Sequence, residues 1–334
     1  MDIYRYMKKF NQIDNVRLKL LALWAMHVTG RRYIGVFFDP VLACNLRCKM
    51  CYFSDEKKRK ELKGIMTAQQ VKHVSEAFFS RAVKVQIGCG AEPTLYKAVP
   101  DIIKEAKKQK VPYVSITTNA NLLTEELVKS YLEAGLDEFT ISMHGVTKDI
   151  YEYFMTNADY DTFCRVLNLI SEAKRKYNFK LRINYTINEK NLEDLNNLFN
   201  VFGDINIDIL QLRPIENIGD AEYNNYDRSA LVDRYDDVID KVKQEAISRN
   251  ITCLAPSMQQ VMSPKQTKGS SIISALAYCY VSPEFYWKSD FNKESDTFAT
   301  YSKRTGLAKQ IFKMIFKSTE KLDEYSKHLN YEIN

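Results

Sequence analysis

The sequence lacks the features that mark several special classes of protein. Across its 334 residues there is no apolar run near the roughly 20 residues that span a bilayer, and no cleavable signal segment, internal repeat or low-complexity linker is recognisable. Only four histidines are present, and they do not pair at metal-ligand spacing. With 45% hydrophobic and 27% charged residues, the chain can bury a full-sized core. We therefore expect an ordinary soluble globular protein.

The charge pattern gives little indication of a polyanionic partner. The formal net charge is +6, and most basic residues are interspersed with Asp and Glu. The densest basic stretch, residues 57–60, lies beside Asp55, Glu56 and Glu61, which is typical of a solvated loop. We expect no nucleic-acid partner.

Cysteine usage points to metal chemistry. Three of the seven cysteines, Cys44, Cys48 and Cys51, form a C-x3-C-x2-C pattern, and a disulfide framework is disfavoured in so long a chain, which predicts a cytoplasmic location. A structural zinc ion takes four ligands, whereas three thiolates on a four-iron, four-sulfur cluster leave one iron open to bind another molecule. Zinc with a distant fourth ligand remains the alternative.

Short β-rich runs alternate with helical periods between residues 33 and 250, which predicts successive βα units and a parallel sheet. Six units can be counted, so the predicted fold is α/β, a partial (β/α)6 TIM-like barrel. An N-terminal helical segment (1–32) precedes this core (33–250), and a C-terminal extension (251–334) follows it. The expected strands are residues 33–39, 83–88, 113–118, 138–143, 180–187 and 208–213.

Helices are expected between these strands and at both ends of the chain. A capping box of Thr67 and Gln70 opens the first of the intervening helices. Residues 18–28 and 307–316 carry broad apolar faces, which we interpret first as core packing. Peripheral membrane contact is the less favoured alternative.

The unusual motifs follow the first four strands. The cysteine loop follows the first, the run from Gly88 to Pro93 the second, Asn119 the third, and Ser142 to Gly145 the fourth. Because ligands of such sheets bind beyond the carboxyl ends of the strands, these loops are expected to converge on one site.

The motifs together resemble those of the radical S-adenosylmethionine (SAM) enzymes over residues 33–250. The resemblance implies that the three cysteines hold one [4Fe-4S] cluster whose open iron chelates SAM. It also implies that reduced flavodoxin or ferredoxin supplies an electron. The resulting 5′-deoxyadenosyl radical would abstract hydrogen from a substrate.

The resemblance also assigns SAM contacts to individual residues. Gly90, Ala91 and Glu92 match the family's Gly-Gly-Glu-Pro motif, with Ala91 in place of a glycine, and would lie near the methionyl ammonium. Asn119 stands where the family has Thr-Asn-Gly, although Ala120 replaces the glycine.

Further contacts are expected around the carboxylate, the ribose and the adenine. Ser142 matches the family's Ser-x-Asp-Gly, with His144 in the Asp position, and Asn184 and Arg213 resemble residues that line the adenine and ribose pocket. Met50 occupies the position of an aromatic residue that stacks near adenine, and Tyr52 could compensate for it. Phe154 falls where many relatives place an arginine, so either the carboxylate is bound differently or the alignment is displaced at this position.

The C-terminal extension leaves the substrate undetermined. Its Tyr278 to Phe285 stretch resembles the start of the SPASM/twitch-type module of this family, but residues 280–334 contain no cysteine, so an auxiliary cluster lacks ligands. Cys279 could donate hydrogen to a substrate or be an inert buried thiol, and the nearby aromatics could bind a ring or close the barrel. A peptide, sugar, lipid or small metabolite remains open, as does a non-catalytic protein that binds a cluster or zinc.

Overall fold

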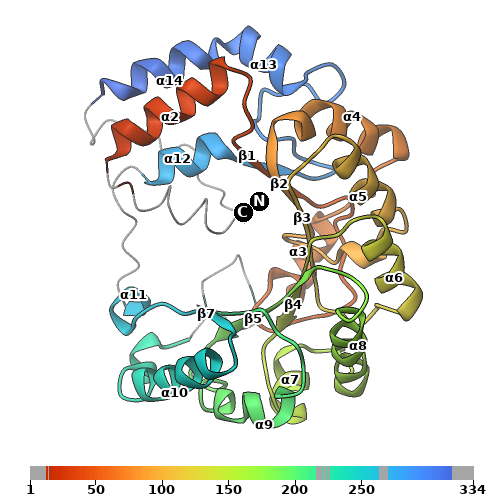
Figure 1. Cartoon of the computed structure of the whole chain (residues 1–334), viewed down its shortest axis with the longest axis vertical. Coiled ribbons are helices and arrows are strands. Elements are labelled where there is room, and N and C mark those ends of the chain that lie inside the picture. The colour runs from red at the N-terminus through yellow and green to blue at the C-terminus, as the bar shows by residue number, and fades with distance from the viewer. Residues whose placement is uncertain are drawn as a thin grey trace.

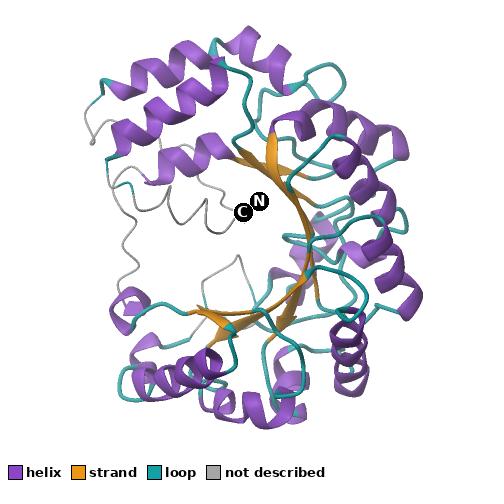
Figure 2. Ribbon diagram, in the orientation of Figure 1, coloured by secondary structure: helices purple, strands orange, loops and turns teal. Residues whose placement is uncertain are grey.

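The computed structural model describes residues 13, 15–215, 221, 223, 226–262 and 270–317 (Figure 1). Its centre is one sheet of parallel strands in the order β7-β6-β5-β4-β3-β2-β1-β8, curved into an arc that does not close, with helices along the outer side (Figure 2). The strands are β1 Ile34–Phe38, β2 Ala82–Ile87, β3 Tyr113–Thr118, β4 Glu138–Met143, β5 Lys180–Ile187, β6 Ile209–Pro214, β7 Thr252–Leu254 and β8 Tyr278–Val281.

The predicted α/β partial barrel is confirmed, but it contains two more strands than the six expected. β3, β4 and β5 have the predicted bounds, whereas β7 and β8 come from the segment after residue 250 and extend the sheet at its two ends. β7 has three residues and β8 has four, and each pairs with only one neighbouring strand at an edge of the sheet. Neither is long enough to show a β pattern in the sequence. The division of the chain at residue 250 stays a prediction.

Two helices begin where their local sequence predicts. Thr67 and Gln70 form the expected capping box of α4, and Thr124 caps α6 by accepting a hydrogen bond from the backbone of Leu127. The α-helices are α2 Val16–Val28, α3 Glu56–Glu61, α4 Ala68–Phe78, α5 Val99–Lys108, α6 Glu125–Glu133, α7 Lys148–Phe154, α8 Tyr160–Ala173, α9 Leu198–Phe202, α10 Tyr235–Ser248, α11 Met258–Met262, α12 Ser270–Ala277, α13 Phe298–Thr305 and α14 Leu307–Ile315. Single 3-10 turns are η1 Tyr52–Ser54, η2 Phe79–Arg81, η3 Pro93–Leu95, η4 Glu193–Asn197 and η5 Arg228–Leu231.

The terminal helices pack on each other beside β8. The rings of Trp24 in α2 and Phe312 in α14 lie 5.2 Å apart, and Trp287 stacks on Phe298 of α13 at 4.9 Å with only 1% of its surface exposed. Most of this aromatic stretch therefore closes the core, as the packing interpretation predicted. No helix among the described residues has the length and apolar character needed to cross a membrane.

The two faces of the sheet differ in polarity. On β4, Phe139, Ile141 and Met143 are fully buried in the apolar core, while the alternate residues Glu138, Thr140 and Ser142 line a pocket on the inner face. The neighbouring strands repeat this alternation. The inside of the arc, which we call the lumen, is thus polar and open to a ligand.

Candidate functional site

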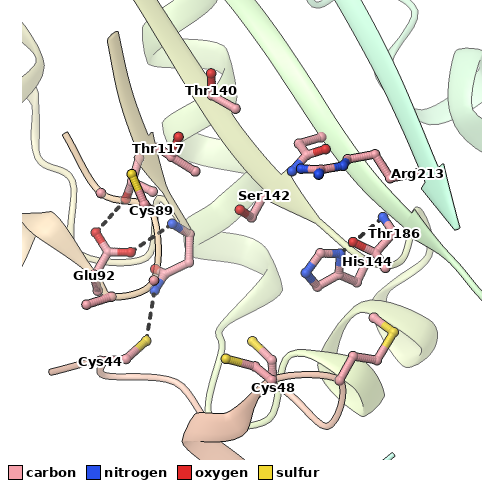
Figure 3. A pocket seen from close by; sticks show the side chains of 18 of the residues that line it. Cys44, Cys48, Cys89, Glu92, Thr117, Thr140, Ser142, His144, Thr186 and Arg213 are labelled. Carbon is pink, nitrogen blue, oxygen red and sulfur yellow. Dashed lines mark hydrogen bonds between the residues drawn. The ribbon is translucent and has the colours of Figure 1, made fainter. Parts of the chain in front are cut away.

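One pocket, of about 380 Å³, runs from the cysteine loop at the carboxyl ends of the strands into the lumen (Figure 3). Thr140 lies at the opposite end of it from Cys44 and Cys48, and Ser142 lies between them (Figure 3). Every residue predicted for the site is part of its lining: Cys44, Cys48, Met50, Cys51, Tyr52, Gly90, Ala91, Glu92, Asn119, Ser142, His144, Asn184 and Arg213. The structure therefore brings these residues together, while their roles as ligands stay predictions.

The cysteine loop is fixed by backbone hydrogen bonds. The amides of Arg47 and Lys49 donate to the carbonyls of Thr156 and Phe154, each at 2.9 Å, and the amide of Cys51 donates to the carbonyl of Cys48 at 2.9 Å. The loop is thereby held against the end of α7, with the cysteine side chains toward the pocket (Figure 3). Such a loop presents its thiols in a defined arrangement before any ligand binds.

The chemistry of these thiols fits an iron–sulfur cluster. Burial raises the pKa of Cys44 to about 12, and burial together with the neighbouring thiols raises the pKa of Cys48. A bound metal deprotonates its coordinating thiols outright. Among the described residues, no three His, Cys, Asp or Glu side chains are grouped so that they could hold one metal ion, whereas a cluster binds each thiolate through a different iron.

Two glycines shape the loop after β2. Gly88 has φ +81°, and a Cβ there would lie 2.4 Å from the carbonyl oxygen of Thr117; a Cβ on Gly90 would lie 2.5 Å from the Tyr52 hydroxyl. That hydroxyl donates a hydrogen bond to the carbonyl of Gly90. Tyr52, with 5% of its surface exposed, thus ties the cysteine loop to the glycine loop.

Glu92 anchors the same loop to β3. One carboxylate oxygen accepts hydrogen bonds from the amide and hydroxyl of Thr94 at 3.1 and 2.6 Å and from the Thr118 hydroxyl at 2.7 Å. The other accepts from the amide of Asn119 at 2.9 Å. Burial raises the pKa of Glu92, and these four hydrogen bonds oppose that rise. The carboxylate therefore positions the loop, and 2% of Glu92 is exposed.

Asp39, which follows β1, was missed in the sequence. Its carboxylate accepts hydrogen bonds from the amides of Cys89 and Gly90 at 2.8 and 3.0 Å and from the Tyr280 hydroxyl at 2.9 Å. Burial raises its pKa to about 6. Asp39 thus joins the glycine loop to β8, so β8 supports the site, although no described residue after residue 250 lines the pocket.

The ends of β3, β4 and β5 offer polar groups to a ligand. Asn119 donates to the side-chain oxygen of Asn45 at 2.9 Å, and Ala120 adopts φ +67° where the family has glycine. Burial lowers the pKa of His144 to about 4, so its imidazole is neutral at pH 7. Its Nδ1 accepts from the amide of Thr186 at 3.4 Å, which assigns the proton to Nε2. The buried Oδ1 of Asn184 has no hydrogen-bond partner among the described residues.

An apolar corner lies beside the cysteines. Met50 packs with Phe154 and Ile215, so Phe154 fills the position where an arginine was considered. Arg213, at the end of β6, lines the pocket and is exposed. Because Phe154 stands where an arginine was considered, the positively charged side chains that line the pocket come from strands such as β6.

The sequence analysis missed the deeper lining of the pocket. It comprises residues that alternate along β2 to β6: Lys84, Gln86, Thr117, Glu138, Thr140, Arg182 and Gln211. The missed signal was this alternation, because strands of a parallel sheet buried on both faces are more continuously apolar.

Cys279 does not take part in the pocket. It is fully buried in the core, and it is absent from the lining, as are Tyr278, Tyr280, Phe285, Tyr286 and Trp287. The hypothesis that Cys279 donates hydrogen to a substrate is therefore wrong, because the inner face of β8 carries its neighbours Tyr278 and Tyr280, of which Tyr278 stacks on Phe37 at 4.1 Å.

Comparison with known proteins agrees with this geometry. The family model described as "Radical SAM superfamily" matches residues 40–202, which contain all three cysteines and the loop of Glu92. Over these residues the chain is similar to the radical SAM superfamily. Radical SAM proteins are enzymes that use a [4Fe-4S] cluster and SAM, so this match confirms the prediction of an enzyme and of these cofactors.

Relatives and solved structures extend the likeness. A probable GTP 3′,8-cyclase of Sulfolobus acidocaldarius is 30% identical over 62% of this chain and 65% of its own length. A second one, of Metallosphaera sedula, is 30% identical over 53% of this chain and 54% of its own length. The chain thus spans about half to two thirds of these relatives.

Solved structures share the fold. SuiB of Streptococcus suis, bound to S-adenosylmethionine, has a TM-score of 0.61 and 14% identity over 81% of this chain and 65% of its own. The protein anSMEcpe with bound AdoMet has a TM-score of 0.53 and 17% identity over 70% of this chain and 67% of its own.

Proposed function

We propose that this chain is a radical enzyme that cleaves SAM reductively and uses the 5′-deoxyadenosyl radical to abstract hydrogen from a substrate. The observation that carries the proposal is the placement of Cys44, Cys48 and Cys51 in the same pocket as the Glu92 loop. When bound, the cluster supplies the electron that breaks the carbon–sulfur bond of SAM. Reduced flavodoxin or ferredoxin is the proposed electron donor, and the cytoplasm the proposed location.

The chain's own residues would bind and orient SAM. Gly90 and Ala91 present backbone without bulky side chains beside the cysteines, so the methionyl ammonium can approach their carbonyl groups. Asn184 offers a buried oxygen that lacks a partner among the described residues, and His144 offers an Nε2–H donor. An unpaired buried acceptor costs about 1–3 kcal/mol, which a ligand donor would recover.

The compared proteins differ in what their names say they act on. The curated relatives are named for GTP, whereas SuiB has been solved with a precursor peptide, SuiA. Neither assignment transfers at these identities and coverages. The substrate therefore has to be argued from the pocket of this chain.

The test is release of 5′-deoxyadenosine from SAM by anaerobically reconstituted protein under dithionite. We expect a product that depends on enzyme and reductant and is quantified by liquid chromatography and mass spectrometry. Colourless protein that holds zinc, or brown protein that releases no 5′-deoxyadenosine even with reduced flavodoxin and deuterated candidate substrates, would support the non-catalytic alternative.

A further inference from the structure

The deep end of the lumen contains a charged layer that the cofactors do not explain. Lys84 lies three residues before the end of β2, which places it roughly 10 Å below the glycine loop. Glu138 and Arg182, at the start of β4 and early in β5, line the same depth of the pocket. The motifs that resemble SAM contacts all lie nearer the mouth.

Glu138 and Arg182 form an ion pair. Arg182 Nε lies 3.2 Å from one carboxylate oxygen of Glu138, and Arg182 also donates to the Gln211 side chain at 2.7 Å. Glu138 accepts from the hydroxyls of Tyr113 and Thr140 at 2.7 and 2.9 Å. With Glu138 fully buried, this network forms a rigid floor to the pocket.

Lys84 is bound differently. Its ammonium donates to the side-chain oxygen of Gln86 at 3.0 Å and lies 5.9 Å from the Tyr113 ring centroid. No carboxylate of a described residue lies within 4.0 Å of it. Burial lowers the pKa of Lys84, which Glu138 only partly offsets. Lys84 is half-buried, and a partly desolvated ammonium with one neutral partner is stabilised when an anion joins it.

The pocket above Lys84 is polar as well as cationic. The buried hydroxyl oxygen of Thr117, which lies beside Gly88 on the strand next to β2, lines the pocket there and has no hydrogen-bond partner among the described residues. Two cations, Lys84 and Arg182, face one carboxylate, Glu138, in this layer. The layer is therefore suited to a negatively charged, hydrogen-bonding group.

We infer that the substrate is a small polar molecule whose oxyanion, a carboxylate or a phosphate, binds Lys84 at the floor of the lumen. The inference rests on the proposed function, since it deepens the same site. With the oxyanion at the floor, the rest of a small substrate extends toward the mouth, where SAM is expected. The cavity of about 380 Å³ must also receive SAM, which favours a small substrate over a bulky one.

The experiment uses reconstituted holoenzyme saturated with SAM, so that the SAM carboxylate is already placed. Thermal unfolding is followed while inorganic phosphate, acetate or succinate replaces chloride at constant ionic strength. We expect at least one of these anions to raise the Tm of the wild-type protein. In Lys84→Met we expect its apparent affinity to fall at least about tenfold, and in Lys84→Arg to be largely retained. The exposed control Lys129→Met should respond as the wild type does.

The outcomes separate the sources of the effect. A rise with phosphate alone identifies a phosphate, and a rise with acetate or succinate alone identifies a carboxylate. Because Lys84→Met removes a partly desolvated ammonium, we expect it to unfold no earlier than the wild type in chloride. Equal anion responses in wild type and Lys84→Met would overturn the inference, as would a strongly destabilised Lys84→Met without anion response. The Tm needs no turnover, so failure of 5′-deoxyadenosine release would be recognised separately.

Discussion

Replacement of Cys48 by serine is expected to abolish iron binding and SAM cleavage. Cys48 is the central cysteine of the loop and lines the pocket, and its loss leaves two thiolates where a cluster requires three. Loss of a mere supporting residue near a metal lowers affinity or activity by about 10–100-fold, so loss of a ligand should cost more than about 100-fold. The measurements are iron per chain and the rate of 5′-deoxyadenosine formation.

Cysteines elsewhere in the chain provide the control for this prediction. Cys164 and Cys253 are half-buried and do not line the pocket, so Cys164→Ser and Cys253→Ser should keep iron content and rate within about twofold of the wild type. Equal losses in all three variants would mean that cysteine oxidation or misfolding, and not ligand removal, explains the effect. Retention of iron by Cys48→Ser would contradict the assignment of the cluster.

Glu92→Gln is expected to destabilise the protein by about 2–4 kcal/mol, because an amide cannot accept at both of its ends. If the amide oxygen faces the two threonines, its NH2 group confronts the amide N–H of Asn119. In the reverse orientation the NH2 group confronts the amide N–H of Thr94, although the two threonine hydroxyls can turn to accept from it. Urea unfolding of the purified protein measures the change. SAM affinity should fall as well, because the glycine loop is no longer tied to β3.

Two further variants calibrate the Glu92 prediction. Thr118→Val removes one of the four donors and also the acceptor of the Ala120 amide, and should cost about 1–3 kcal/mol. Glu76→Gln alters an exposed carboxylate 3.9 Å from Lys72 and should be nearly neutral. A Glu92→Gln variant as stable as Glu76→Gln would show that the four hydrogen bonds contribute nothing to the loop.

The sequence predicted most of the sheet because its strands carry strong local signals. The bounds of β3, β4 and β5 follow from β-rich runs that end in turn residues, and the cysteine spacing is visible without any structure. β8 was missed because four residues gain their strand identity only by pairing with β1, over 240 positions earlier in the chain. Short edge strands depend on such tertiary contacts.

The site was predicted where one motif carries the chemistry and missed where distant groups meet. Glu92 was found from its motif, but its bonds to Thr118 and Asn119 depend on two loops meeting in space. Asp39 was predicted only as the last residue of the first strand, although its carboxylate binds the glycine loop and Tyr280. Lys84 was overlooked because a lysine in a strand usually faces bulk solvent. In this sheet the polar face of the strand lines the lumen instead.

The most direct test is the electron paramagnetic resonance spectrum of the dithionite-reduced protein before and after addition of SAM, together with its iron and sulfide content. The account predicts about four irons and four sulfides per chain and a reduced-cluster spectrum that changes when SAM binds the open iron. Glu92→Gln should require more SAM for the same change. Stoichiometric zinc, or a cluster whose spectrum is unaffected by saturating SAM, would contradict the central claim that Cys44, Cys48 and Cys51 leave one iron open for this cofactor.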